Sequence, residues 1–174
     1  MFVVSHVCTM RGMTKQQADA ADMSDEELLN AVGPAFGKLR RSSLLEVEDP
    51  ISQKDLGRTL VLNVVLEIGQ DGAREVTVGA VGAHLGTDPS VASRMVSDCI
   101  SAGYLVRAAS QQDGRRTVLH LSPGGEELMA RFRRHQRSAF EYITADWSER
   151  ERLDFARLML KYVASQESLR RRGA

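Results

Sequence analysis

The sequence contains few cysteines and aromatic residues, no net charge and no long hydrophobic run. Its 174 residues include only 2 cysteines, too few for a disulfide framework, which favours a reduced, cytoplasmic protein. A transmembrane helix needs about 20 consecutive apolar residues, and no such stretch exists. Phe2–Val4 is too brief for the apolar region of a signal peptide. The chain is nevertheless long enough to bury a sizeable core.

The 23 basic and 23 acidic residues cancel, which argues against a protein that coats nucleic acid through a generally basic surface. A local basic face remains compatible with this balance, because a dimer presents each contact twice. Arg makes up most of the basic residues, and its planar guanidinium suits paired hydrogen bonds with phosphate and guanine. No nucleophile motif, metal signature or phosphate-binding loop is found, so we expect neither an enzyme nor a cofactor.

Apolar periodicity and capping residues predict six helices and one hairpin. The capping boxes Ser24–Glu27 and Ser148–Glu151 begin the first and last helices. Thr77 caps a third helix, and Asp88 followed by Pro89 caps and opens the fourth. The elements between the two boxes are helices over 56–68, 78–85 and 89–102, strands over 105–110 and 117–122, and a long helix from 122. This order predicts a mainly α winged helix-turn-helix fold with a small β-hairpin wing.

Gly79 and Gly82 lie inside the third predicted helix, where each costs about 1 kcal/mol relative to alanine. We interpret them as sites of close helix packing. A phosphate loop is disfavoured because no strand precedes them and the Lys-Ser/Thr pair is missing.

The predicted helix 89–102 carries two stripes of different character. One stripe is apolar and is expected to face the core: Ala92, Met95, Val96 and Cys99. The other combines small hydroxyls with one guanidinium: Ser90, Arg94, Ser97 and Ser101. Short side chains let a helix approach the major groove closely, so this stripe predicts a DNA-reading surface. An ordinary solvated face is the alternative.

Asp113–Gly114 between the two strands is a strong hairpin signal. Arg115 and Arg116 lie at or beside its tip, where guanidinium groups are attracted to a narrow minor groove. A solvated turn explains the two arginines equally well in isolation. Their position directly after a helix-turn-helix favours the wing interpretation.

From about Val76 to Gly125 the chain resembles the MarR (multiple antibiotic resistance regulator) family of bacterial winged-helix regulators. The segments that carry the resemblance are 76–78, 85–86, 90–96, 103–107, 113–115 and 121–125. The resemblance implies a triangular dimer with interlocked terminal helices. It also implies that Asp113 orients the wing and that Arg115 enters the minor groove. The resemblance also implies which residues face the major groove: Ser90, Val91, Ser93, Arg94 and Ser97.

Two positions depart from the family. An aromatic residue is frequent where Val61 stands, and family ligands commonly bind near that helix, so the effector site is left unassigned. The position after the recognition stripe is often basic but is Asp98 here, which predicts weaker phosphate contacts.

The terminal helices carry apolar stripes too extensive for a lobe of about 70 residues to cover, so we expect a homodimer. The expected domains are a flexible leader at 1–23, a dimerisation helix and linker at 24–55, a DNA-binding lobe at 56–122 and dimerisation helices at 123–174. A twofold dimer predicts a palindromic operator with half-sites about one turn (~34 Å) apart.

These features predict a repressor that binds double-stranded DNA and responds to a small-molecule effector. One alternative is a winged-helix protein-interaction module without DNA binding. Another is a redox or metal sensor on the same fold. Cys99 lies on the apolar stripe and Cys8 has no evident partner, which disfavours redox sensing. No metal site is expected, because the histidines are scattered: His6, His84, His120 and His135.

Overall fold

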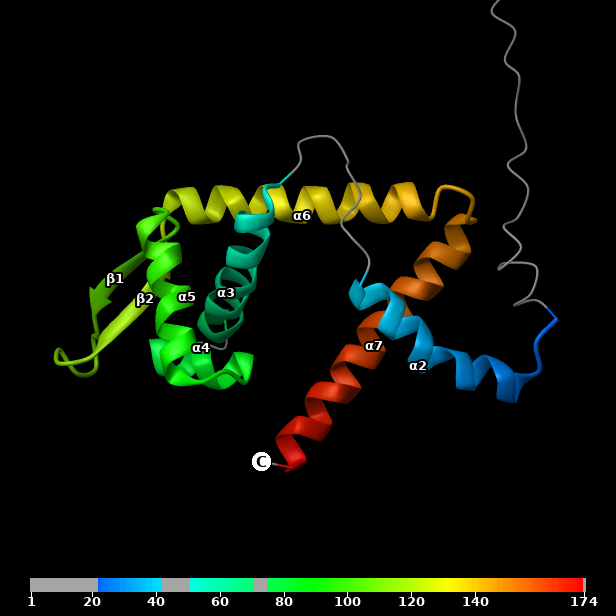
Figure 1. Ribbon diagram of the computed structural model, residues 1–174, viewed down its shortest axis with the longest axis horizontal. Helices are drawn as coiled ribbons and strands as arrows, with labels where there is room; N and C mark the ends of the chain where they lie inside the picture. The colour runs from blue at the N-terminus through cyan, green and yellow to red at the C-terminus, as the bar shows by residue number, and fades with distance from the viewer. Residues whose placement is uncertain (1–21, 42–50, 71–74, 174) are drawn as a thin grey trace, which may run out of the picture. The chain divides into compact units, whose positions relative to one another are not determined.

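The computed structural model describes residues 22–41, 51–70 and 75–173. The chain divides into two compact units, Met1–Leu45 and Glu46–Ala174. The first unit contributes α2 (Asp25–Arg41). The second unit contains α3 (Gln53–Gln70), α4 (Val78–Leu85), α5 (Pro89–Ser101), β1 (Leu105–Ala109), β2 (Thr117–Leu121), α6 (Pro123–Ile143) and α7 (Glu149–Gly173) (Figure 1). The expected mainly α winged helix-turn-helix fold with a β-hairpin is confirmed, and the role of the terminal helices in a dimer stays a prediction. The expected leader lies outside the described residues except for its last two positions.

Two helices begin at the predicted capping boxes. In α2, the Glu27 amide donates to Ser24 Oγ at 3.4 Å and the Ser24 amide donates to Glu27 Oε2 at 2.9 Å. In α7, Ser148 and Glu151 form the same pair of hydrogen bonds, at 3.3 and 2.7 Å. These reciprocal bonds satisfy amide groups that have no partner inside the helix.

Helix α3 begins three residues before the predicted start at Leu56. Ser52 Oγ accepts from the Asp55 amide at 3.0 Å and donates to Asp55 Oδ2 at 2.8 Å. The segment Ser52–Asp55 is therefore a capping box closed by Asp rather than Glu. Its first turn lacks a continuous apolar pattern, so periodicity alone placed the start too late.

The connection between α4 and α5 is a tight turn. Thr77 Oγ1 accepts from the Ala80 amide at 3.1 Å, as predicted, and Gly86 ends α4 in the left-handed region with φ 62°. The predicted side-chain cap at Asp88 is wrong. The Val91 amide, which such a cap would use, donates to the Asp88 carbonyl instead at 3.0 Å. Pro89 does occupy the start of α5, as predicted.

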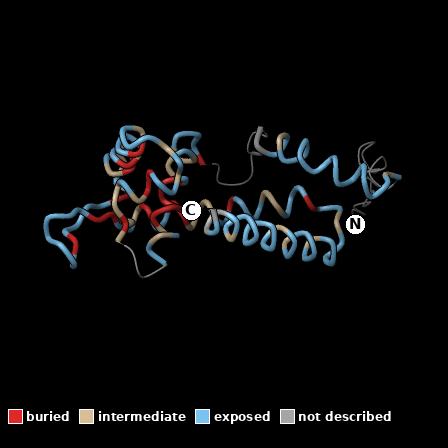
Figure 2. Tube along the Cα trace, turned by 90° about the horizontal axis from the view of Figure 1, so that it is seen from below, coloured by how far each residue is buried: buried red, intermediate tan, exposed pale blue. Residues whose placement is uncertain are grey.

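The core lies among α3, α4, α5, the hairpin and the first turns of α6 (Figure 2). Its most deeply buried large apolar side chains are Val61, Leu62, Val81, Val96, Leu105, Leu119 and Met129. The strands pair antiparallel from Leu105 opposite Leu121 to Ala109 opposite Thr117, and each ends one residue earlier than predicted. Among the described residues, no helix is both long and apolar enough to cross a membrane.

The glycines of this lobe differ in how closely other atoms approach them. A Cβ added at Gly82 would lie 3.0 Å from the Ala92 Cβ, so α4 and α5 pack closely there, as predicted. Gly79 has no such neighbour; only Thr77 Oγ1 would come within 4 Å, at 3.9 Å. At Gly125 an added Cβ would overlap the Tyr104 carbonyl oxygen. Gly125 therefore lets α6 begin directly against the segment between α5 and β1.

We expect Gly125→Ala to lower the free energy of unfolding by about 2 kcal/mol, because the new methyl group meets backbone that cannot rotate away. Gly79→Ala is the matched control and should stabilise the protein by up to about 1 kcal/mol, since helix propensity improves without a clash. Urea denaturation gives the free energy of unfolding of both variants. Equal stability of the two variants would contradict this packing.

Candidate nucleic-acid interface

Helix α5 separates its two predicted stripes. Ala92, Val96 and Cys99 are buried and Met95 is half-buried, so the apolar stripe does face the core. The opposite side carries side chains that are all exposed: Ser90, Ser93, Arg94, Ser97 and Ser101. The structure thus confirms which side chains α5 offers to solvent. Their contact with DNA stays a prediction.

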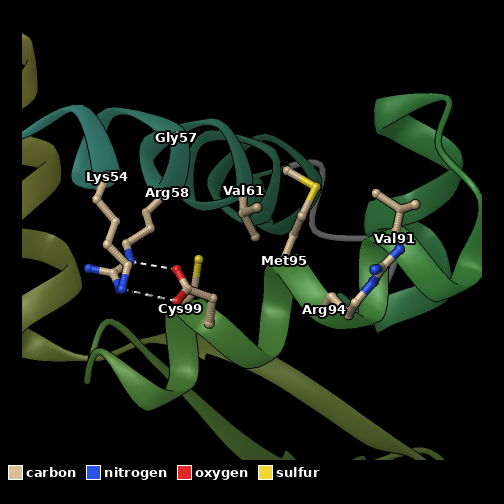
Figure 3. Close-up of a pocket in the computed structure, with 9 residues that line it drawn as sticks. Lys54, Gly57, Arg58, Val61, Val91, Arg94, Met95 and Cys99 are labelled. Atoms are coloured by element: carbon tan, nitrogen blue, oxygen red, sulfur yellow. Dashed lines mark hydrogen bonds and ion pairs between the residues drawn. The ribbon is translucent and has the colours of Figure 1, made fainter.

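Arg94 and Val91, which both belong to the predicted DNA-binding set, also make contacts within the protein. Arg94 Nε donates to the Ser90 carbonyl at 3.3 Å, one turn earlier on the same helix. Val91 is half-buried and lines a hollow between α3 and α5, so it lies on the flank of the exposed stripe (Figure 3). Both residues can still take part in a groove contact, with Val91 at its edge.

The wing turn is held by Asp113, as the family resemblance implies. Asp113 Oδ1 accepts from the Arg115 amide at 3.1 Å, and the Asp113 carbonyl accepts from the Arg116 amide at 2.8 Å. Both arginine side chains are exposed. Arg116 Nη1 also lies 3.9 Å from Glu75 Oε2, so its charge is partly balanced within the protein. Arg115 is therefore the more available of the two cations.

The base of the wing is anchored by two residues that the sequence analysis did not identify. Ser110 Oγ accepts from the amides of Gln112 and Asp113 at 3.0 and 2.9 Å. Its hydroxyl in turn donates to Glu75, a largely buried carboxylate that precedes α4. Glu75 and Ser110 are 35 residues apart in the chain. No local pattern signals such a contact.

An ion-pair cluster joins α3 to α5. Arg58 Nε donates to Asp98 Oδ2 at 2.7 Å, and Arg58 Nη1 donates to Asp55 Oδ1 at 2.8 Å. The guanidinium carbon also lies 5.6 Å from the centre of the Tyr104 ring. Hydrogen bonds from Arg58 lower the pKa of Asp98, so this carboxylate stays ionised. The same bonds, with those to Asp55, raise the pKa of Arg58.

The hollow beside this cluster has a volume of about 450 Å³. Its walls combine apolar side chains, among them Val61 and Met95, with the charged groups Arg58, Arg94 and Asp98 (Figure 3). Apolar walls with a few converging polar groups are typical of small-molecule sites. Val61, where the family often has an aromatic residue, lines this hollow although it is only 1% exposed.

Cys99 is part of the core, as predicted. Burial, with the negative charge of Asp98, raises the pKa of its thiol to about 11. A thiol with so high a pKa is almost entirely protonated at neutral pH and is a poor nucleophile.

Among the described residues no cluster of metal-ligating side chains occurs. His84 forms a pair with Glu67 instead, with 2.9 Å between Nε2 and Oε2.

In a Cys8→Ser variant, Cys99 should react with a disulfide reagent at pH 8 roughly 100-fold more slowly in the folded protein than in urea, because a pKa raised by two units leaves 100-fold less thiolate. Absorbance of the released thiol measures both rates. Comparable rates in the two states would restore the redox-sensor alternative.

Comparison with known proteins agrees with this geometry. The MarR family model matches residues 55–116. A MarR transcriptional regulator from Methanosarcina mazei Go1 superposes with a TM-score of 0.59 at 14% identity, covering 80% of this chain and 99% of that one. A MarR family protein from Bacillus stearothermophilus gives 0.56 at 18% identity, covering 90% and 99%. A mutant of S. aureus MepR gives 0.55 at 16%, covering 83% and 99%. No curated protein matches the chain.

Proposed function

We propose that the chain is a winged-helix regulator of the MarR family, whose model matches residues 55–116. In this proposal it represses transcription as a homodimer that binds a palindromic DNA operator. In this proposal α5 lies in the major groove, and the wing between β1 and β2 reaches the adjacent minor groove. Residues 56–122 would form the DNA-binding lobe, and residues 24–55 and 123–174 the dimerisation regions. A small molecule would weaken operator binding.

The observation that supports DNA binding best is the exposed stripe of α5. Four small hydroxyl side chains surround one guanidinium there: Ser90, Ser93, Arg94, Ser97 and Ser101. A face evolved only for solubility would carry more long charged side chains. The exposed Arg115 on the wing adds a second cation at a separate element.

Arg94→Ala and Arg115→Ala should each weaken DNA binding about tenfold or more, since a specific arginine contact is worth about 1–3 kcal/mol. The probe is a duplex selected from a random pool by the wild-type protein, and fluorescence anisotropy gives the affinity. Arg150→Ala, an exposed arginine on α7 paired only loosely with Asp154 at 3.7 Å, is the control and should bind like wild type.

Salt titration separates DNA recognition from the protein-interaction alternative. Affinity of the wild type should fall steeply as salt rises, because bound arginines release counterions from the phosphates. Failure to enrich any duplex at low salt would favour a module that binds protein alone. Full DNA affinity in both arginine variants would contradict the proposed recognition surface.

Homodimerisation is supported by apolar side chains that the monomer leaves uncovered. In α7, Leu158 is 64% exposed and Leu160 is 71% exposed. In α2, Leu29 is 74% exposed, and at the end of α6 Ile143 is 63% exposed. Single exposed apolar residues are ordinary, whereas a series along several helices marks an interaction surface. A second copy of the chain is the partner that requires no further component.

Leu160→Glu should shift the protein toward monomer, because it places a charge in the proposed interface, and DNA affinity should fall with it. Analytical ultracentrifugation gives the mass at micromolar concentration. Gln166→Glu, an exposed position on the same helix, is the matched control and should remain dimeric. A monomeric wild type would refute the dimer outright.

The hollow between α3 and α5 is the place where we propose that the effector binds. Its walls come from both helices, among them Gly57 and Val61 of α3 and Met95 of α5. A molecule held there contacts the DNA-reading helix directly, so its binding free energy can favour a different position of α5. The effector would need an apolar body with a polar group near Arg58 or Arg94.

A further inference from the structure

We propose that Arg58 is a positioning residue for DNA binding: its guanidinium holds the Asp98 carboxylate toward α3 and so keeps this negative charge from opposing the DNA phosphates. The inference rests on the proposed function, since it concerns how α5 meets DNA. It also accounts for an acidic residue at a position where DNA binding would favour a basic one.

Arg58 and Asp98 form a bidentate ion pair, the Arg58–Asp98 fork. Arg58 Nε donates to Asp98 Oδ2 at 2.7 Å, and Arg58 Nη2 donates to Asp98 Oδ1 at 3.2 Å (Figure 3). Two parallel bonds fix the carboxylate in orientation as well as in distance. Lys54 Nζ lies 3.8 Å from Asp98 Oδ1 and adds a second, more exposed cation on the same side.

Arg58 is itself fixed from its other side. Its Nη1 donates to Asp55 Oδ1 at 2.8 Å, and Asp55 also accepts from Ser52, which caps α3. The guanidinium lies over the Tyr104 ring, 5.6 Å from its centre. The fork is therefore tied to the start of α3 and to the segment that follows α5. Such a cluster resists displacement better than an isolated surface ion pair.

Asp98 lies next to the exposed stripe. It directly follows Ser97 and stands four residues after Arg94, which places it beside Arg94 on the helix surface. Its side chain is 45% exposed, whereas that of Arg58 is only 13% exposed. An Asp98 carboxylate released from the fork would thus lie among the groups proposed to meet phosphates.

A direct contact between Arg58 and DNA is a poorer explanation of the same residue. All three of its nitrogen atoms already bond to carboxylates, and little of the side chain reaches solvent. Removing Arg58 should therefore act on DNA through the charge that it leaves behind on Asp98. That charge can be removed separately, which makes the role testable.

The experiment is a double-mutant cycle with the duplex selected by the wild-type protein as the probe. Arg58→Met should weaken binding roughly fivefold to tenfold, the effect of one unpaired charge near a phosphate in water. Asp98→Asn alone should bind at least as tightly as wild type. The double variant Arg58→Met/Asp98→Asn should return to within about twofold of Asp98→Asn.

Arg58→Lys serves as a second variant that keeps the positive charge without the fork, and it should bind within about threefold of wild type. Thermal unfolding accompanies every affinity measurement. Unchanged affinity in Arg58→Met, a loss that Asp98→Asn does not restore, or a Lys variant as weak as the Met variant would each overturn the proposal. If the wild type selects no duplex, the proposed function itself fails, and the two failures are therefore distinct.

Discussion

The packing of α5 against the core is the constraint on which the rest of the structure depends. Ala92, Val96 and Cys99 are all 1% exposed or less, and they fix the rotation of the helix about its axis. Gly82 lets α4 approach closely enough to close the turn between the two helices. Once α5 is fixed in this rotation, the side chains opposite the core must point toward solvent. The surface that we propose reads DNA is in this sense a consequence of the core.

A zero net charge is compatible with such a surface because three acidic residues of this lobe are engaged within the protein. Asp98 is bound by Arg58, Asp113 by the backbone of the wing, and Glu75 by Ser110. Arg94 and Arg115 have no ion-pair partner among the described residues. What matters for binding a nucleic acid is therefore the local balance of positive and negative charges, which the net charge of the chain does not reveal.

Local patterns predicted most of the fold, because helix periods, capping residues and a hairpin turn act over a few residues. They placed α4 and both capping boxes correctly and separated the two faces of α5. Ser52 was missed although its spacing to Asp55 is visible, and the cap at Asp88 was expected where the backbone already satisfies the amide. Contacts such as Arg58 with Asp98, 40 residues apart, depend on tertiary packing that no short pattern encodes.

The most direct test of the account is affinity cleavage from the exposed face of α5. An iron chelate attached to a cysteine at Ser101, at the end of the stripe, should cut the selected duplex at two places about one helical turn (~34 Å) apart. Cys8→Ser removes the other cysteine that could be labelled, and Cys99 is buried. The same chelate at Ser138 on α6 should leave the duplex intact. Cleavage from Ser138 with none from Ser101 would show that another face of the protein meets DNA.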